Sequence, residues 1–222
     1  MTLKERIQKT VENPLAVGGL LINLIPIFAV LFLGWGAAPL VFLYWLENIV
    51  MGFVTLARMT ASTMKQHPIG LIGMLFYGPF FTVHYGLFCI AHGWILAGLA
   101  GGESAKATMD FEAPEAIFEV ALASGAYMPL FLAVIAGWQT AVFVIDFLWK
   151  GQFRNTSLEK EMVAPYGNIV VLHIAIIFGA WAVLAFGENL VGVLALILLR
   201  AAWAVFLDMR RVFKEEPEAI KS

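Results

Sequence analysis

Residues 71–100 read LIGMLFYGPFFTVHYGLFCIAHGWILAGLA and contain no Asp, Glu, Lys or Arg. An α-helix rises about 1.5 Å per residue, so roughly 20 apolar residues cross a bilayer core about 30 Å thick. The stretch is long enough to span such a core, and it carries two histidines. It predicts a membrane helix whose few polar side chains are the first candidates for a function.

Five other stretches satisfy the same length and composition, so the chain as a whole predicts an all-α, polytopic membrane helix bundle. The six predicted spans are residues 15–33, 39–59, 71–100, 128–149, 165–186 and 189–208. The chain is 61% hydrophobic and 14% charged, whereas soluble domains carry about a quarter charged residues. A net charge of -2 gives no indication of nucleic-acid binding. We expect one transmembrane domain covering residues 1–222.

The basic residues are distributed unevenly between the two sides of this predicted bundle. One side holds only Lys106, and Arg200 lies inside the last span. The other side holds Lys4, Arg6, Lys9, Arg58, Lys65, Lys150, Arg154, Lys160, Arg210, Arg211, Lys214 and Lys221. Because basic loops stay in the cytoplasm, both termini are predicted to be cytoplasmic. The expected location is a bacterial inner membrane, with lipids as the immediate partners.

Three segments outside the spans have recognisable character. Residues 2–12 are charged and predict a short interfacial helix at the N-terminus. Residues 101–126 form the one sizeable external loop, and residues 114–124 within it predict a second interfacial helix. Residues 150–164 are polar and charged, and we expect an ordinary cytoplasmic connector there.

Function should lie in the polar groups that a membrane rejects, since a charge near mid-bilayer costs at least about 2.5–3.5 kcal/mol on insertion scales. Counted from the predicted helix ends, five of these groups from five helices lie roughly 12–20 Å deep. These five are Glu47, His84, Gln139, His173 and Arg200. His92 lies two turns beyond His84 on a similar face of the same helix, and Asp146 lies near the cytoplasmic end of its span.

The leading hypothesis is an intramembrane metal site made by Glu47, His84, His92 and His173. Imidazole and carboxylate are common ligands of zinc and iron, and an open coordination position would make the metal catalytic. In a second version, His84 and His173 are the axial ligands of a haem b. Supporting polar groups are expected from Asn48, Gln139, Asp146 and Arg200.

Other readings of the same residues stay open. They could form a buried polar network that joins the helices, with Arg200 paired to Asp146 or Glu47. They could also carry protons or cations in a small transporter or channel, including a homo-oligomeric pore. A structural or partner-binding membrane protein is the third reading. Whether the chain is an enzyme is left undecided, and so is any catalytic residue.

Three segments resemble the signature segments of an uncharacterised bacterial six-helix membrane family, a domain of unknown function. They are YWLEN at residues 44–48 with Arg58, FFTVHYGLFCIAHG at 80–93, and Pro165-Tyr166-Gly167 through His173. The resemblance implies recurring roles for Glu47, Asn48, His84, His92 and His173. It also implies a histidine in the middle of the fourth span, where this chain has Gln139. A full histidine site would therefore be weaker here.

Overall fold

The computed structural model describes residues 14–64, 67–99, 114–167, 169–170, 172–174 and 177. Every regular element in these ranges is helical, which confirms the all-α prediction for the described part of the chain. The elements are α2 (Pro14–Leu33), α3 (Ala37–Thr63), α4 (His67–Leu99), α6 (Pro114–Ala123), α7 (Met128–Val142), the π-helix η1 (Phe143–Trp149), the 3-10 helix η2 (Gln152–Asn155) and α8 (Leu158–Val163).

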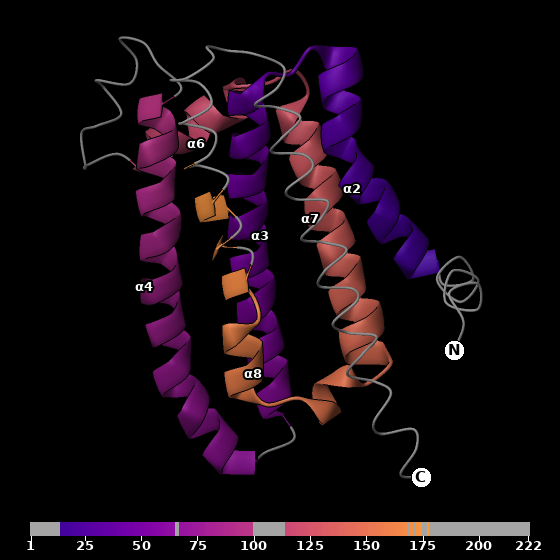
Figure 1. The fold of residues 1–222 in the computed structure, drawn as a ribbon. Helices are drawn as coiled ribbons and strands as arrows, with labels where there is room; N and C mark the ends of the chain where they lie inside the picture. Colours follow the sequence, from indigo (N-terminus) through magenta and orange to yellow (C-terminus); the bar gives the residue numbers. More distant parts are fainter. Residues whose placement is uncertain are drawn as a thin grey trace.

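Helix α3 is the centre of the bundle. It packs against α4 on one side and α7 on the other, and α2 packs on α7, so the four long helices stand in the order α4, α3, α7, α2 (Figure 1). All seven residues from Leu40 to Leu46 are buried, as expected for a helix that is apolar all round and enclosed by neighbours. Helix α6 lies across the end of the bundle where α3 begins, and contacts α3 and α4.

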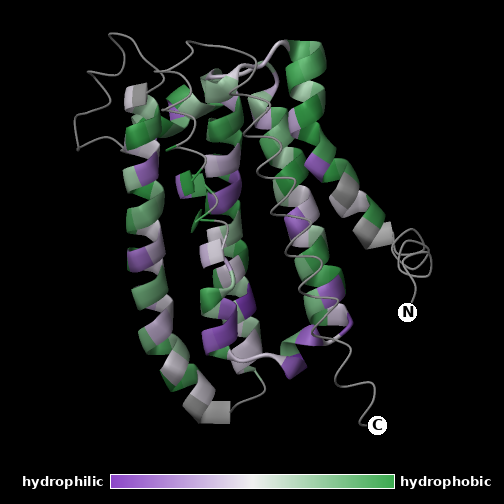
Figure 2. Ribbon diagram, in the orientation of Figure 1, coloured by the Kyte–Doolittle hydropathy of each residue, from purple (hydrophilic) through white to green (hydrophobic). Residues whose placement is uncertain are grey.

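Three of the described helical stretches are long and apolar enough to cross a membrane: Ala37–Thr63, Gly70–Gly98 and Met128–Trp149. Their outward surface is apolar as well, and Figure 2 shows hydrophobic colouring along much of the four long helices. On α4, for example, Leu75 is 78% exposed and Phe76 is 69% exposed. A soluble monomer rarely exposes such contiguous apolar surface, whereas a bilayer would cover it.

The predicted helices agree with the described ones wherever the two can be compared. The first four predicted spans are α2, α3, α4, and α7 continued by η1. The predicted interfacial helix at 114–124 is α6. The fifth predicted span is helical at its described positions from Tyr166 onward, here called the Tyr166 helix (166–167, 169–170, 172–174 and 177).

Several predictions fall outside the described residues. They concern the N-terminal segment 2–12, residues 101–113 of the external loop, and the sixth span at 189–208 with Arg200. The number of spans and the cytoplasmic position of both termini therefore stay predictions.

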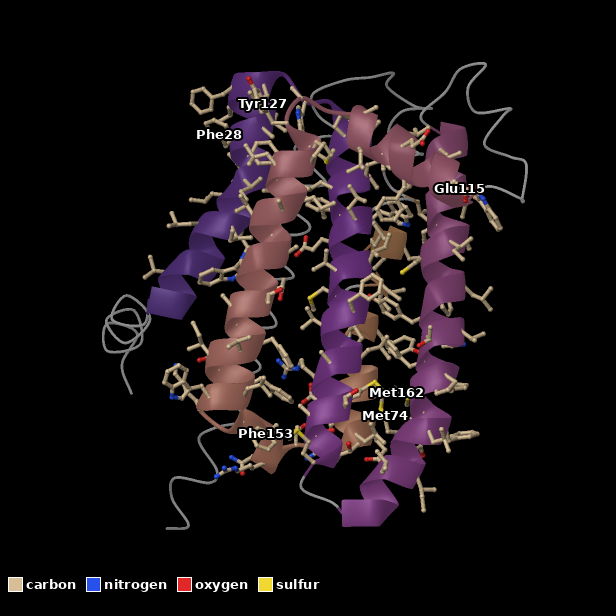
Figure 3. The ribbon with its side chains drawn as sticks, turned by 180° about the vertical axis from the view of Figure 1, so that it is seen from behind. Phe28, Met74, Glu115, Tyr127, Phe153 and Met162 are labelled. Atoms are coloured by element: carbon tan, nitrogen blue, oxygen red, sulfur yellow. The ribbon has the colours of Figure 1, made fainter. Side chains whose placement is uncertain are left out.

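The segment 150–164, predicted as an ordinary connector, contains two short helices, η2 and α8. Part of this segment folds as α8, which packs against both α3 and α4. Its apolar residues enter a small core, where Leu158 is 2% exposed and Met162 packs beside Met74 of α4 (Figure 3). The segment contains apolar residues spaced i, i+4 and i+7 at Leu158, Met162 and Pro165, which is one helical face. Helix α8 therefore leads the Tyr166 helix into the groove between α3 and α4.

Candidate functional site

Two of the predicted site residues meet directly. His92 of α4 and His173 of the Tyr166 helix lie 81 positions apart in the sequence, and their Nε2 and Nδ1 atoms are 2.8 Å apart. The two ring centroids are 5.1 Å apart and the rings are nearly perpendicular, at 88°. His92 is 3% exposed, whereas His173 is exposed. One nitrogen of each ring is therefore engaged in a direct imidazole–imidazole hydrogen bond.

The other nitrogen of His92 is held by its own helix. His92 Nδ1 lies 2.7 Å from the carbonyl oxygen of Phe88, one turn earlier on α4. The Phe88 ring also stacks on the His92 ring, with centroids 6.2 Å apart. Both nitrogens of the buried ring thus have partners, and the orientation of the imidazole is fixed.

The approach of the two rings is that of a hydrogen bond. Two imidazole nitrogens bound to one tetrahedral zinc at about 2.0–2.1 Å each would lie roughly 3.3 Å apart, about 0.5 Å further than observed. Among the described residues, no group of three His, Cys, Asp or Glu side chains is placed to hold a metal ion. Binding of zinc, iron or haem b stays a prediction.

His84, the predicted partner of these residues, lies among aromatic rings. It is exposed on α4 and stacks on Phe80, with centroids 5.4 Å apart and an interplanar angle of 10°. Its ring also lies 5.2 Å from that of Phe88 and 5.9 Å from that of Tyr166. Phe88 therefore stands between His84 and His92, and the described contacts of His84 are with aromatic rings.

Glu47 and Asn48 lie on α3, where it faces α4. Glu47 is half-buried and Asn48 is 5% exposed. The Asn48 side-chain amide donates to the carbonyl of Tyr44, 2.9 Å away, which aims Oδ1 in the other direction. This Oδ1 atom is buried and accepts no hydrogen bond from any described residue.

The seam between α3 and α4 sets the position of His92. Trp45 of α3 donates its indole N–H to the carbonyl of Cys89, 2.7 Å away, and Tyr85 of α4 donates its hydroxyl to the carbonyl of Asn48, 2.9 Å away. A Cβ on Gly93 would lie 2.7 Å from the Trp45 ring, so only glycine leaves room for this approach. Small residues that let helices come close are typical of membrane bundles.

Two of the three remaining supporting residues, Gln139 and Asp146, are described, and neither has a recorded contact with the histidine pair. Asp146 pairs with Lys150, one turn further along, with 2.7 Å between carboxylate oxygen and ammonium nitrogen. Gln139 is half-buried on α7. Arg200 lies outside the described residues, so its expected pairing with Asp146 or Glu47 stays a prediction.

A second polar cluster, absent from the predicted site, lies at the opposite end of the α3–α4 groove. Glu161 of α8 is 6% exposed and both of its carboxylate oxygens are engaged. Oε2 lies 2.5 Å from Arg58 Nε, and Oε1 accepts from the Thr156 hydroxyl at 2.7 Å. The Arg58 guanidinium also lies 4.1 Å from the ring centre of Phe147. We call these four residues the Arg58 cluster.

The sequence contains a signal for Glu161. It occupies a helical position next to Leu158, Met162 and Pro165, so it is a carboxylate on the apolar face of α8. A carboxylate on such a face needs a charged or hydrogen-bonding partner. Arg58 lies near the end of the predicted second span, and its contacts with Glu161 of α8 and Phe147 of η1 join three elements of the bundle.

The family model described as Family of unknown function (DUF6498) matches residues 5–221. The chain belongs to this family. The match covers nearly the whole of this DUF6498 protein, including both histidines of the pair and the Arg58 cluster. No curated protein and no solved structure matches it significantly. Its function therefore has to be argued from the residues themselves.

Proposed function

We propose that this DUF6498 protein is a multi-pass protein of the bacterial inner membrane that takes up and releases protons at the His92–His173 pair, in proton-coupled transport of an ion or small solute. The observation that carries the proposal is the 2.8 Å contact between a buried and an exposed imidazole. Histidine is the side chain whose charge ordinarily changes between pH 5 and 8.

The apolar surroundings support the membrane part of the proposal. Three described helices can span a bilayer, and α4 turns large apolar side chains outward on the face that would meet lipid. Within such a bundle, ionisable side chains are rare and typically mark proton or ion pathways.

The type of contact supports proton exchange over the metal site considered from the sequence. A pair of imidazoles joined by one hydrogen bond can share an added proton across that bond. A metal ion would need the two nitrogens to separate by about 0.5 Å and a third ligand to approach.

The test uses full-length protein reconstituted in liposomes that contain a pH-sensitive dye. We expect an imposed pH gradient to decay faster with wild-type protein than in empty liposomes in the presence of at least one of the ions sodium, potassium and chloride. His173→Phe, which keeps a ring but removes both nitrogens, should bring the rate back to that of empty liposomes.

The matched control is Thr82→Val. Thr82 is exposed on α4, the helix of His92, and donates its hydroxyl to the Gly78 carbonyl of α4, 2.9 Å away, so its replacement should leave the rate unchanged. Equal rates of decay of the pH gradient for wild type, His173→Phe and empty liposomes with all three ions would overturn the proposal.

A further inference from the structure

The hydrogen bonds of the histidine pair form a directed series that begins at the Phe88 carbonyl. A carbonyl oxygen only accepts hydrogen bonds, so the nitrogen facing it, His92 Nδ1, must carry a hydrogen. This contact is 2.7 Å long and its acceptor is a main-chain atom of the same helix. The protonated nitrogen of His92 is therefore set by the backbone of α4.

The identity of the second donor follows. A neutral imidazole has one N–H and one acceptor nitrogen, so His92 Nε2 is the acceptor. His173 Nδ1, 2.8 Å away, must then donate. The reverse direction would require His92 to carry a hydrogen on both nitrogens and hence a positive charge, which is unfavourable within an apolar bundle.

One nitrogen is left over. If His173 donates through Nδ1, its Nε2 has a lone pair that the pair itself does not use. Nε2 lies on the other side of the ring from His92, and His173 is exposed whereas His92 is 3% exposed. The two rings thus differ: both nitrogens of His92 have partners, whereas His173 Nε2 is a basic atom with no hydrogen-bond partner among the described residues.

We infer that His92 is a positioning residue that holds His173 in the Nδ1–H tautomer, and that His173 Nε2 is the atom at which the site binds a proton. The inference rests on the proposed function for the identity of the ligand, but the tautomer itself does not. The inference also excludes a proton relay through the pair. His92 Nδ1–H faces a carbonyl, which does not take up a proton, so a proton cannot pass beyond His92. The proton therefore binds at and leaves from the same atom, His173 Nε2.

The experiment records ring nitrogen–proton correlations by NMR on full-length protein labelled with ¹⁵N-histidine in lipid nanodiscs. Signals are assigned from His84→Phe, His92→Gln and His173→Phe. We expect both His92 and His173 to carry their hydrogen on Nδ1. A His173 ring protonated at Nε2 in the wild-type protein would overturn the inference without recourse to any variant.

Two substitutions of His92 separate positioning from packing. In His92→Gln, the side-chain oxygen can accept from His173 and the amide nitrogen can donate to Phe88, so His173 should keep its Nδ1–H signal. His92→Leu fills similar space without an acceptor, and His173 should lose that signal. Identical His173 signals in wild type, His92→Gln and His92→Leu would contradict a positioning role.

The liposome assay separates this inference from the proposed function. If His173 shows the Nδ1–H tautomer but wild-type protein moves no protons, the proposed function fails and the tautomer assignment stands. If proton movement depends on His173 but its ring carries the hydrogen on Nε2, the proposed function stands and the positioning role of His92 fails. Where both hold, His92→Gln should move protons faster than His92→Leu.

Discussion

The polar clusters at the two ends of the α3–α4 groove differ in how completely their hydrogen-bonding groups are paired. In the Arg58 cluster, both oxygens of Glu161 have donors, and the guanidinium lies against an aromatic ring. At the other end, His92 and His173 share a single neutral hydrogen bond, and one basic nitrogen of His173 has no donor among the described residues. One cluster is saturated and the other is not.

This difference indicates which cluster stabilises the fold and which cluster can bind a ligand. A buried charge is stable only when it is paired and hydrogen-bonded, and then it has no capacity for a further ligand. A neutral pair with a spare acceptor can take up a ligand without first breaking its own contact. We therefore expect substitutions in the Arg58 cluster to change stability first, and substitutions at the histidine pair to change function first.

The largest effect should come from breaking the ion pair. Arg58→Ala leaves the Glu161 carboxylate, whose side chain is 7% exposed, without its cation. We expect a loss of about 3 kcal/mol in the free energy of unfolding, at the low end of the range for buried pairs because the Arg58 side chain is 29% exposed. The measurement is unfolding of detergent-solubilised protein by a denaturing detergent.

The double variant Arg58→Met with Glu161→Leu is the control for this prediction. It removes both charges, so most of the lost stability should return. If the comparison between the two clusters is right, Arg58→Ala should also leave the His173 Nδ1–H signal in place at temperatures where the protein is folded. A single variant as stable as wild type would show that the Arg58 cluster does not hold the bundle together.

The second prediction concerns the close approach of α4 to α3 next to His92. Gly93→Ala would place a Cβ 2.7 Å from the Trp45 ring and 3.0 Å from Ile117, so the helices must separate. Overpacking of this kind costs about 1–3 kcal/mol. Because His92 is the neighbouring residue, we also expect the ring signals of His92 and His173 to shift.

Gly86→Ala on the same helix is the matched control. Nothing lies within 4 Å of a Cβ at that position, and both variants gain the same helix propensity of about 1 kcal/mol. The difference between the two unfolding free energies therefore isolates the contacts with Trp45 and Ile117. Equal stabilities would mean that the α3–α4 seam does not set the position of the histidine pair.

The smallest effect is expected from Tyr85→Phe. The substitution removes one hydroxyl that donates to the Asn48 carbonyl between the two clusters. Interhelical hydrogen bonds in membrane proteins contribute about 0.6 kcal/mol on average and up to about 1.7 kcal/mol. We expect a loss in that range, measured by the same unfolding experiment.

Tyr127→Phe provides the reference, because Tyr127 is 64% exposed and surface substitutions usually change stability by less than about 0.5 kcal/mol. Equal losses of stability for the two tyrosine variants would mean that the Tyr85–Asn48 hydrogen bond does not stabilise the packing of α3 against α4.

Much of the helical layout could be predicted from the sequence. The ends of α2 and α3 lie on either side of Gly34-Trp35-Gly36, and the predicted fourth span ends at Trp149, as η1 does. These predictions succeed because hydrophobic length and helix-ending residues are local properties. The packing of α8 within residues 150–164 was not predicted, because the charged residues of this segment obscure a short apolar face that becomes evident only in the packed structure.

The sequence by itself also determined which polar residues lie on the apolar helices, among them Asn48, His84, His92 and His173. Their contacts were decided by the tertiary structure. His92 and His173 are 81 positions apart, and their meeting depends on how α4 and the Tyr166 helix rotate about their own axes. That rotation follows from packing, such as the space left by Gly93 for Trp45 and the insertion of α8 between α3 and α4. Helical periodicity sets which residues share a face, but only close packing decides which faces meet and which ring nitrogens form the hydrogen bond between the two histidines.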